Sequence, residues 1–501
     1  MNYVFFFPDE MRANSVSCYG NRHVKMPNYD RLARQGVLFE NCIVQNPVCS
    51  PSRCCLFQGQ YVHNKGHRTL WHLLRKEEPN MFRYLKDSGY DIAWYGKNDL
   101  FSQDCLEEIC TDIDQKRNGY DTLPSHKTGM VCKGNNPHQP EDPEFYSFLY
   151  DPIHTEMNEL LWDENVARGI DFIKSRKKTD KPFFLYLPLT MPHPPYNALE
   201  QYYNMYDPNE VGEDMIWPED TKNKPEFMEL IRRYRRLDDM DRSVLKKIYA
   251  VYLGMNSYVD QMLGGILDAL EEQDMMDDTM IIVSSDHGDW AGNYGLVEKW
   301  PNAMDDNIVR VPLIVKAPGN CSGHVVSEQV ELFDIMPTVL ETAGIEPMHT
   351  HFGKSLLPQL QGEKGDPERT VFCEGGYDTF EPHCSEAYEG ELHAKRNIAM
   401  RSPENIYYPK ILQQKEHPES VCRTVMIRTL KYKYVQRTSG DNELYDLIND
   451  PQELHNCYGE KEYAAIQQEL KEQLLMWYLK TSDTVPYVDD PRGFRRQLEN
   501  G

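Results

Sequence analysis

Short apolar runs alternate along most of this chain with segments of helical period, and this alternation limits its possible folds more than any other feature. Runs rich in aromatic or β-branched residues predict buried parallel strands at residues 3–7, 92–95, 183–187, 280–284 and 312–315. Helical patterns are found at residues 28–35, 80–88, 164–175, 243–272 and 332–343. This order predicts an α/β fold whose large, mostly parallel sheet is sandwiched by helices.

The character of the chain changes beyond residue 365. The run RTVMIRTLKYKYVQRT and the following NELYDLINDPQELHN predict antiparallel strands and a polar turn, and residues 463–479 predict an amphipathic terminal helix. We therefore expect two parts: an α/β domain over residues 1–370, and a smaller α+β subdomain over residues 371–501 with an antiparallel sheet. A chain of 501 residues is long enough to bury a core in both.

The net charge excludes some classes of partner. The chain has 54 Lys and Arg against 79 Asp and Glu residues, which gives a formal charge of −25. A negative field of this size disfavours nucleic acid or an anionic membrane as the main partner. It does not exclude a small anionic substrate, because local basic groups can override the global sign at short range.

No segment of the sequence predicts a membrane span or a secretion signal. No apolar run approaches the roughly 20 residues that cross a bilayer, and the N-terminal MNYVFFFPDEMR predicts a first strand rather than a signal peptide. The 13 cysteines lack the regular spacing of a disulfide framework, so mostly reduced thiols are expected. These features favour a cytoplasmic protein.

Charged and polar side chains follow four of the predicted strands. The carboxyl ends of parallel strands in an open α/β sheet lie at one edge, where ligands bind. A shared site at this edge is therefore expected to contain Asp9 and Glu10, Lys97, His193, and Asp286 with His287.

The stretch NPVCSPSRCCLFQG, residues 46–59, predicts the start of a helix. Pro51 suits a first helical turn and Gly59 a helix end. Cys49 would lie at the positive end of the helix dipole with Arg53 one turn further on, which suits an anion or an activated nucleophile. A buried structural cysteine is the alternative. The spacing of zinc-binding cysteine pairs and the C-x5-R loop of cysteine phosphatases are both absent.

The order of these motifs resembles that of the type I, formylglycine-dependent sulfatases of the alkaline phosphatase superfamily, along almost the whole chain. CSPSR at 49–53 matches the C-x-P-S-R core of the sulfatase signature. Further matches are GK at 96–97, PHPPY at 192–196, SDHGDWAGNYGLVEKW at 285–300 and ELYDLINDPQE at 443–453. The resemblance implies an alkaline phosphatase-like fold and hydrolysis of a sulfate ester or an N-sulfate.

The resemblance also implies the chemistry of single residues. In such enzymes the cysteine at the position of Cys49 is converted to Cα-formylglycine by a formylglycine-generating enzyme, and the hydrated aldehyde attacks sulfur. The implied catalytic residues are Cys49, Arg53, Lys97, His193 and Lys299, with the lysines on the sulfate oxygens and His193 protonating the leaving oxygen. The implied metal ligands are Asp9, Glu10, Cys49, Asp286 and His287, for Ca²⁺ first and Mg²⁺ or Mn²⁺ as alternatives.

Two positions depart from the usual pattern. Asp99 replaces the histidine of the common G-K-x-H motif, and its negative charge would repel sulfate at that position. Asp99 is therefore expected to contact substrate hydroxyls, to orient Lys97, or to lie outside the site. Glu10 stands where many relatives have a second Asp, which leaves its ligation open. His63 and His67 follow the signature helix, with a supporting or a structural role.

The organic half of the substrate is expected to contact two polar loops, residues 101–160 and 381–403. Candidate binding residues there are His126, Lys127, Lys133, His383, His393, Lys395, Arg396 and Arg401. Basic groups beside aromatics predict a sulfated mono- or disaccharide, such as a glycosaminoglycan fragment. Aryl, alkyl or choline sulfates, phosphonate monoesters and phosphodiesters remain alternatives, as does a binding protein that has lost the chemistry. No feature predicts an oligomeric state.

Overall fold

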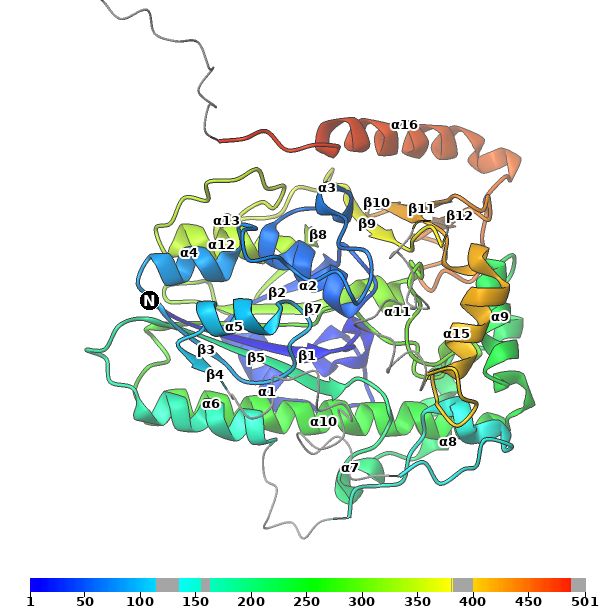
Figure 1. The fold of residues 1–501 in the computed structure, drawn as a ribbon, viewed down its shortest axis with the longest axis horizontal. Helices are drawn as coiled ribbons and strands as arrows, with labels where there is room; N and C mark the ends of the chain where they lie inside the picture. The colour runs from blue at the N-terminus through cyan, green and yellow to red at the C-terminus, as the bar shows by residue number, and fades with distance from the viewer. Residues whose placement is uncertain (114–134, 155–162, 380, 382–399, 488–501) are drawn as a thin grey trace, which may run out of the picture.

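A central eight-stranded sheet lies between two helical layers, beside a smaller four-stranded sheet (Figure 1). The computed structural model describes residues 1–113, 135–154, 163–379, 381 and 400–487. The strand order in the large sheet is β4-β3-β5-β1-β6-β7-β2-β8. These strands are β1 Asn2–Asp9, β2 Val37–Ile43, β3 Asp91–Trp94, β4 Asp112–Ile113, β5 Phe183–Pro192, β6 Thr279–Ser284, β7 Arg310–Lys316 and β8 His324–Glu331.

One predicted strand has the opposite direction to the one expected. The run at residues 312–315 was predicted to be parallel, but β7 is antiparallel to both β6 and β2, whereas the other pairs of the large sheet are parallel. The reason lies in the connection: residues 285–309 contain only short helical turns and do not cross back over the sheet. A parallel neighbour of β6 would need such a crossover. The mostly parallel α/β fold is otherwise confirmed.

Helices cover both faces of the large sheet. In Figure 1, α1, α6 and α10 lie below the sheet and α2, α4 and α12 above it. The helices of the main part are α1 Pro27–Gln35, α2 Cys49–Gln58, α3 Val62–Lys65, α4 Met81–Asp87, α5 Gln103–Ile109, α6 Glu164–Ser175, α7 Glu200–Tyr203, α8 Pro208–Val211, α9 Glu226–Tyr234, α10 Arg242–Glu272, α11 Asp306–Val309, α12 Ile335–Thr342 and α13 Leu357–Leu360. The five helices expected from the sequence are confirmed as α1, α4, α6, α10 and α12, the last preceded by a 3-10 turn over Leu332–Asp334.

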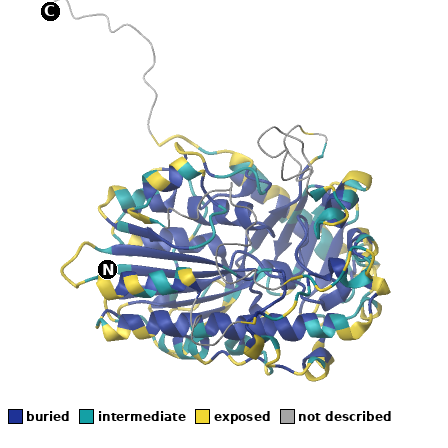
Figure 2. Ribbon diagram, turned by 60° about the horizontal axis from the view of Figure 1, so that its bottom comes forward, coloured by how far each residue is buried: buried dark blue, intermediate teal, exposed yellow. Residues whose placement is uncertain are grey.

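The central strands are apolar because both faces of the sheet are covered. Tyr3 to Phe7 of β1 and Phe183 to Leu187 of β5 are buried side by side, which explains why their sequences do not alternate with polar residues (Figure 2). The edge strand β8 is different: it alternates between buried and exposed residues along its first half, and neither it nor β2 was predicted. No helix in the described part of the chain is long and apolar enough to span a bilayer.

The small sheet is antiparallel, as predicted, and has the order β12-β11-β10-β9. Its strands are β9 Val371–Gly375, β10 Thr424–Arg428, β11 Tyr432–Arg437 and β12 Glu443–Asp446, and the C-terminal part also contains α15 Tyr408–Glu416 and α16 Ala464–Thr481. One face packs on α16, where the rings of Phe372 and Trp477 stack at 4.5 Å. The other face, with Cys373 and Met426, joins the core of the main part. The predicted boundary at 370/371 falls at the start of β9, and separate folding of the two parts stays a prediction.

Candidate active site

The polar side chains that follow the strands gather at one edge of the large sheet, as predicted. Asp9 ends β1, and in the sheet register it pairs with Pro192 at the end of β5. This pairing brings Glu10 beside His193, whose Nε2 lies 3.4 Å from Oε2 of Glu10. Asp286 follows the next strand, β6, and its Oδ1 accepts a hydrogen bond from the backbone nitrogen of Glu10 at 3.2 Å. The order of β5, β1 and β6 in the sheet therefore brings Asp9, Glu10 and Asp286 close together.

Helix α2 brings Cys49 into this cluster. Cys49 is the first residue of the helix, and all ten residues of α2 are buried. Its Sγ lies 3.1 Å from Nε2 of His287, 3.6 Å from Oδ1 of Asp9 and 3.6 Å from Nζ of Lys97. Burial raises the pKa of the Cys49 thiol, Asp9 adds to this effect, and Lys299 and Lys97 oppose it. An unmodified Cys49 is therefore a protonated thiol at neutral pH.

Arg53, one turn along α2, bridges the two central carboxylates. Its Nε donates to Oδ2 of Asp286 at 2.9 Å and its Nη2 to Oδ2 of Asp9 at 2.8 Å, and all three side chains are fully buried. Ser52 donates its hydroxyl to the backbone oxygen of Asp286 at 2.6 Å. Burial opposes ionisation of Asp9, but Lys97 and Arg53 outweigh it and hold the pKa of that carboxyl well below its usual value. The carboxylate of Asp9 is thus charged and fixed in place.

Four of the predicted metal ligands have donor atoms close enough for one ion. One donor atom each from Asp9, Cys49, Asp286 and His287 lies within 4.8 Å of the others, and all four residues are buried. His287 Nδ1 lies 2.9 Å from the backbone oxygen of Gly288, which directs Nε2 toward the cluster. Buried carboxylate oxygens together with one imidazole nitrogen fit a divalent cation.

Glu10 lies at the margin of this group. Its donor atoms cluster with those of Asp9 and His193 instead, and its Oε1 accepts a hydrogen bond from Lys299 Nζ at 2.8 Å. Its Oε2 is buried and has no hydrogen-bond partner among the described residues. A buried oxygen in this state is costly unless a ligand or ion satisfies it. Glu10 is held by Lys299 on one side and is available for a ligand on the other.

The two predicted sulfate-binding lysines contact different carboxylates of the site. Lys97 Nζ lies 2.6 Å from Oδ2 of Asp9 and 2.8 Å from Oδ2 of Asp99. Lys299 Nζ lies 3.1 Å from Nε2 of His193. Asp99 is therefore in the site as a partner of Lys97, which is one of the roles expected for it. Burial lowers the pKa of His193, and the charges of Lys299 and Lys97 lower it further, so the imidazole is neutral at neutral pH.

Some supporting residues of the site were not predicted. Glu298 is buried, has an unusual positive φ of 66°, and its Oε2 accepts a hydrogen bond from Arg235 Nη2 at 2.6 Å. Tyr196 donates its hydroxyl to Oδ1 of Asp289 at 2.7 Å, and the backbone nitrogen of Glu298 donates to the same hydroxyl at 3.0 Å. The sequence places Glu298 and Tyr196 inside quoted motifs, but nothing in it shows that they meet.

Other predicted residues lie elsewhere. His63 Nδ1 is 2.8 Å from Oε2 of Glu374 and its Nε2 is 2.8 Å from the backbone oxygen of Thr481, so it ties α3 to the C-terminal part, and His67 pairs with Glu78. Arg401 is exposed. The remaining predicted substrate contacts lie outside the described residues: His126, Lys127, Lys133, His383, His393, Lys395 and Arg396.

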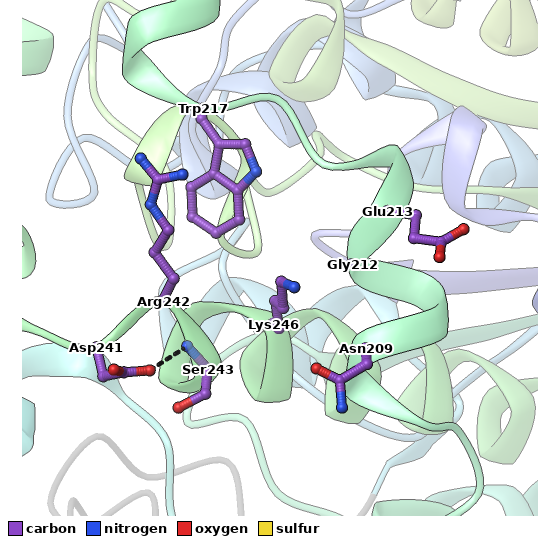
Figure 3. A pocket seen from close by; sticks show the side chains of 8 residues that line it. All are labelled: Asn209, Gly212, Glu213, Trp217, Asp241, Arg242, Ser243 and Lys246. Carbon is purple, nitrogen blue, oxygen red and sulfur yellow. Dashed lines mark hydrogen bonds between the residues drawn. The ribbon is translucent and has the colours of Figure 1, made fainter.

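A separate surface cavity of about 440 Å³ lies at the start of α10 (Figure 3). The guanidinium of Arg242 stacks over the ring of Trp217 at 4.6 Å from its centroid. Asp241 accepts a hydrogen bond from the backbone nitrogen of Ser243 at 2.8 Å and so caps α10. The lining residues are Asn209, Gly212, Glu213, Trp217, Asp241, Arg242, Ser243 and Lys246, which include none of the predicted site residues.

Comparisons with known proteins agree with the fold and the motifs. The sulfatase family model matches residues 1–345, and a model described as "N-sulphoglucosamine sulphohydrolase, C-terminal" matches residues 391–480. The chain is 26% identical over 497 residues to the uncharacterized sulfatase YidJ of Escherichia coli, covering 96% of this chain and 88% of that protein. It is 25% identical over 564 residues to the N-acetylglucosamine-6-O-sulfatase of Bacteroides thetaiotaomicron, covering 100% of this chain and 90% of that one.

Among solved structures, the phosphonate monoester hydrolase of Agrobacterium radiobacter has a similar fold, with a TM-score of 0.72, 23% identity and coverage of 96% of both chains. This likeness supports the alkaline phosphatase-like architecture. The family match covers more than two thirds of the chain and includes the motifs that form the cluster. The chain therefore belongs to the sulfatase family of the alkaline phosphatase superfamily, a family of sulfuric ester hydrolases.

Proposed function

We propose that this protein hydrolyses the sulfate ester of a small saccharide through a formylglycine made from Cys49. The position of Cys49 carries the proposal: it begins a buried helix in the C-x-P-S-R motif, within 3.6 Å of Asp9, His287 and Lys97. A protonated, buried thiol is a poor nucleophile. A hydrated aldehyde at the same position would supply one hydroxyl to attack sulfur and a second whose deprotonation releases sulfate.

A divalent cation would be held by Asp9, Asp286 and His287 together with the group at position 49. Bound there, it would supply the positive charge that lowers the pKa of the attacking hydroxyl. Ca²⁺ is the cation we propose, because buried carboxylate oxygens are its preferred ligands, and Mg²⁺ or Mn²⁺ remain alternatives. Arg53 holds both aspartates in place through its ion pairs with them.

Lys97 and Lys299 would neutralise the sulfate oxygens, since Lys97 Nζ lies 3.6 Å from Cys49 Sγ and Lys299 is buried beside Glu10 and His193. His193 Nδ1 lies 2.5 Å from the backbone oxygen of Pro194, so the neutral ring carries its proton there and accepts at Nε2, 3.1 Å from Lys299 Nζ. His193 would protonate the leaving oxygen from Nε2 after the ring has taken up a second proton from solvent. An anionic sulfate beside the imidazole would oppose the two lysine charges that lower the pKa of His193.

The substrate class we propose is a sulfated mono- or disaccharide, such as a glycosaminoglycan fragment. Two findings support it: one relative acts by name on N-acetylglucosamine 6-O-sulfate, and the C-terminal part matches a model named for N-sulphoglucosamine hydrolysis. Asp99 pairs with Lys97 through Oδ2 and is partly exposed, and its carboxylate would accept a hydrogen bond from a sugar hydroxyl. We also propose a cytoplasmic location, which cell fractionation would test.

A second candidate activity is hydrolysis of phosphonate monoesters, favoured by the similarity in fold to a phosphonate monoester hydrolase. A direct comparison of turnover rates distinguishes the two activities. Turnover of sulfated glucosamines at rates well above those of a phenylphosphonate ester supports the sulfatase, and the reverse order supports the second candidate. Aryl and choline sulfates belong in the same assay, because they share the reacting group but present no sugar.

The first test is peptide mass spectrometry across residues 48–53 of protein from its native host, or co-produced with a formylglycine-generating enzyme. We expect formylglycine or its hydrate at position 49, and sulfate release that is lost in Cys49→Ala. Cys321→Ser is the matched control, since Cys321 lies outside the site. An unmodified thiol in active protein would refute the mechanism, and modified protein that binds but does not turn over sulfated sugars would indicate a binding relative.

A further inference from the structure

A second group of side chains of the types that bind metals lies in the turn between β12 and α16 and shares no residue with the cluster around Cys49. Donor atoms of His455, Cys457 and Glu460 lie within 4.8 Å of one another. Nε2 of His455 is 2.9 Å from Oε1 of Glu460. This nitrogen is shielded from solvent, yet it makes no hydrogen bond of normal geometry with any described residue. The nitrogen thus faces the Glu460 carboxylate without a hydrogen bond to satisfy it, which is a position that a bound cation between the two groups could fill.

The backbone between these side chains is fixed by its neighbours. The Asn456 side chain accepts hydrogen bonds from the backbone nitrogens of Leu444 and Tyr458, at 2.9 and 3.0 Å. It donates to the backbone oxygens of Asn223 and Asn442, at 2.9 and 3.0 Å. Four hydrogen bonds to one side chain hold the turn in a single conformation. Ligands on such a turn lose little entropy when they bind an ion.

Further backbone contacts hold the two ends of the turn. The backbone nitrogen of Cys457 donates to the oxygen of Leu444 at 2.8 Å, and that of Glu460 donates to the oxygen of Cys457 at 3.1 Å. The nitrogen of His455 donates to Oδ2 of Asp450 at 2.8 Å. These bonds keep the three donor groups on one side of a short loop without any ion present.

We propose that His455, Cys457 and Glu460 bind a zinc-type divalent cation, with water in the fourth position. One thiolate, one imidazole and one carboxylate form a donor set typical of Zn²⁺ and not of the oxygen-seeking Ca²⁺ or Mg²⁺. In a tetrahedral site with normal bond lengths, ligand atoms are about 3.3–3.8 Å apart. The present separations, from 2.9 to at most 4.8 Å, require only small side-chain movements.

An ion at the proposed site would stabilise the contact between the main part of the chain and its C-terminal part. The nitrogen of Lys222 donates to the oxygen of Leu454 at 2.8 Å, and the nitrogen of Asn456 donates to the oxygen of Lys222 at 3.1 Å. An ion bound to residues 455–460 would therefore reinforce this contact. The site shares no residue with the cluster around Cys49, and the inference does not depend on the proposed sulfatase activity.

Cobalt provides a direct test, because a thiolate ligand gives Co²⁺ a charge-transfer absorption band. The protein to titrate is Cys49→Ala, in which the cluster at the large sheet contributes no thiol. We expect one equivalent of Co²⁺ to produce the band. Adding Cys457→Ser should abolish the band, whereas adding Cys321→Ser, which removes another accessible thiol, should leave it unchanged. His455→Ala and Glu460→Gln should each weaken binding by about 10- to 100-fold or more.

A second measurement uses the unmutated protein. Saturating Zn²⁺ should slow alkylation of Cys457 by iodoacetamide, followed by peptide mass spectrometry, and leave the rate at Cys321 unchanged. A cobalt band that survives Cys457→Ser, or an alkylation rate that Zn²⁺ does not change, would overturn the proposal.

Discussion

Replacing Arg53 by methionine tests whether the two aspartates depend on it. The guanidinium donates to Asp9 at 2.8 Å and to Asp286 at 2.9 Å, and none of the three side chains is exposed to solvent. Methionine keeps an unbranched apolar stem that reaches about as far as Arg53 Nε, and it lacks the guanidinium, which lies 5.3 Å from the centroid of the Phe7 ring. The substitution therefore removes the charge and the hydrogen bonds and keeps the packing of the stem.

The expected loss is large because both carboxylates stay buried. Removing one partner of a buried ion pair costs about 3–5 kcal/mol, most of it from the charge left behind. We expect Arg53→Met to lower the free energy of unfolding by about that amount when cations are chelated. Arg22→Met is the matched control: its side chain is 68% exposed and pairs with Asp214, so about 0–1 kcal/mol is expected.

Urea unfolding followed by tryptophan fluorescence measures both variants, with EDTA and with excess Ca²⁺. A bound cation would compensate the aspartates that Arg53 no longer neutralises, so Ca²⁺ should stabilise Arg53→Met more than the unmutated protein. A loss of less than about 1 kcal/mol in EDTA, equal to that of the exposed control, would refute the assigned role of Arg53.

Three further predictions concern the same site. Gly96→Ala should lower the free energy of unfolding by more than about 1–3 kcal/mol in thermal unfolding, because the φ of Gly96 is 137° and a Cβ would lie 2.2 Å from the oxygen of Pro188. Gly89→Ala is the control: Gly89 also has a positive φ but has open space around it, so this variant should lose less stability. Burial opposes ionisation of Glu298, but Lys410, Lys299 and Arg235 lower its pKa from 4.5 to about 2. The Glu298 carboxylate therefore contributes about 3 kcal/mol to the free energy of unfolding above about pH 4.5, and this contribution is lost as the pH falls toward about 2. Glu298→Gln should flatten the dependence of the free energy of unfolding on pH between these two values. An unchanged pH dependence would contradict the ion pairs assigned to Glu298. Adding Ca²⁺ at about 100 times its Kd to protein freed of cations by a chelator should raise the free energy of unfolding by about 2.7 kcal/mol, measured by calorimetry. Asp286→Asn should remove this effect. Equal stabilisation of the variant and the unmutated protein would place the cation elsewhere.

The fold could be predicted largely from the sequence because buried strands have a clear local signature. The runs at β1, β5 and β6 are apolar throughout, and a strand covered on both faces has this composition in any α/β protein. The direction of β7 could not be predicted in this way. Its residues are equally apolar in either direction, and only the connection from β6 decides between them. The edge strand β8 was missed for the opposite reason, since it is partly exposed and carries polar residues.

For the site, the sequence by itself determined which residue types follow the strands and that Cys49 begins a helix with Arg53 one turn later. Both depend only on the order and spacing of nearby residues, and the geometry of a strand or helix then fixes where those residues lie. Only the tertiary structure decided that Glu10 contacts Lys299 and His193, and that Glu298 is held by Arg235. Such contacts join residues up to hundreds of positions apart, and their strength depends on burial, which sequence order does not record.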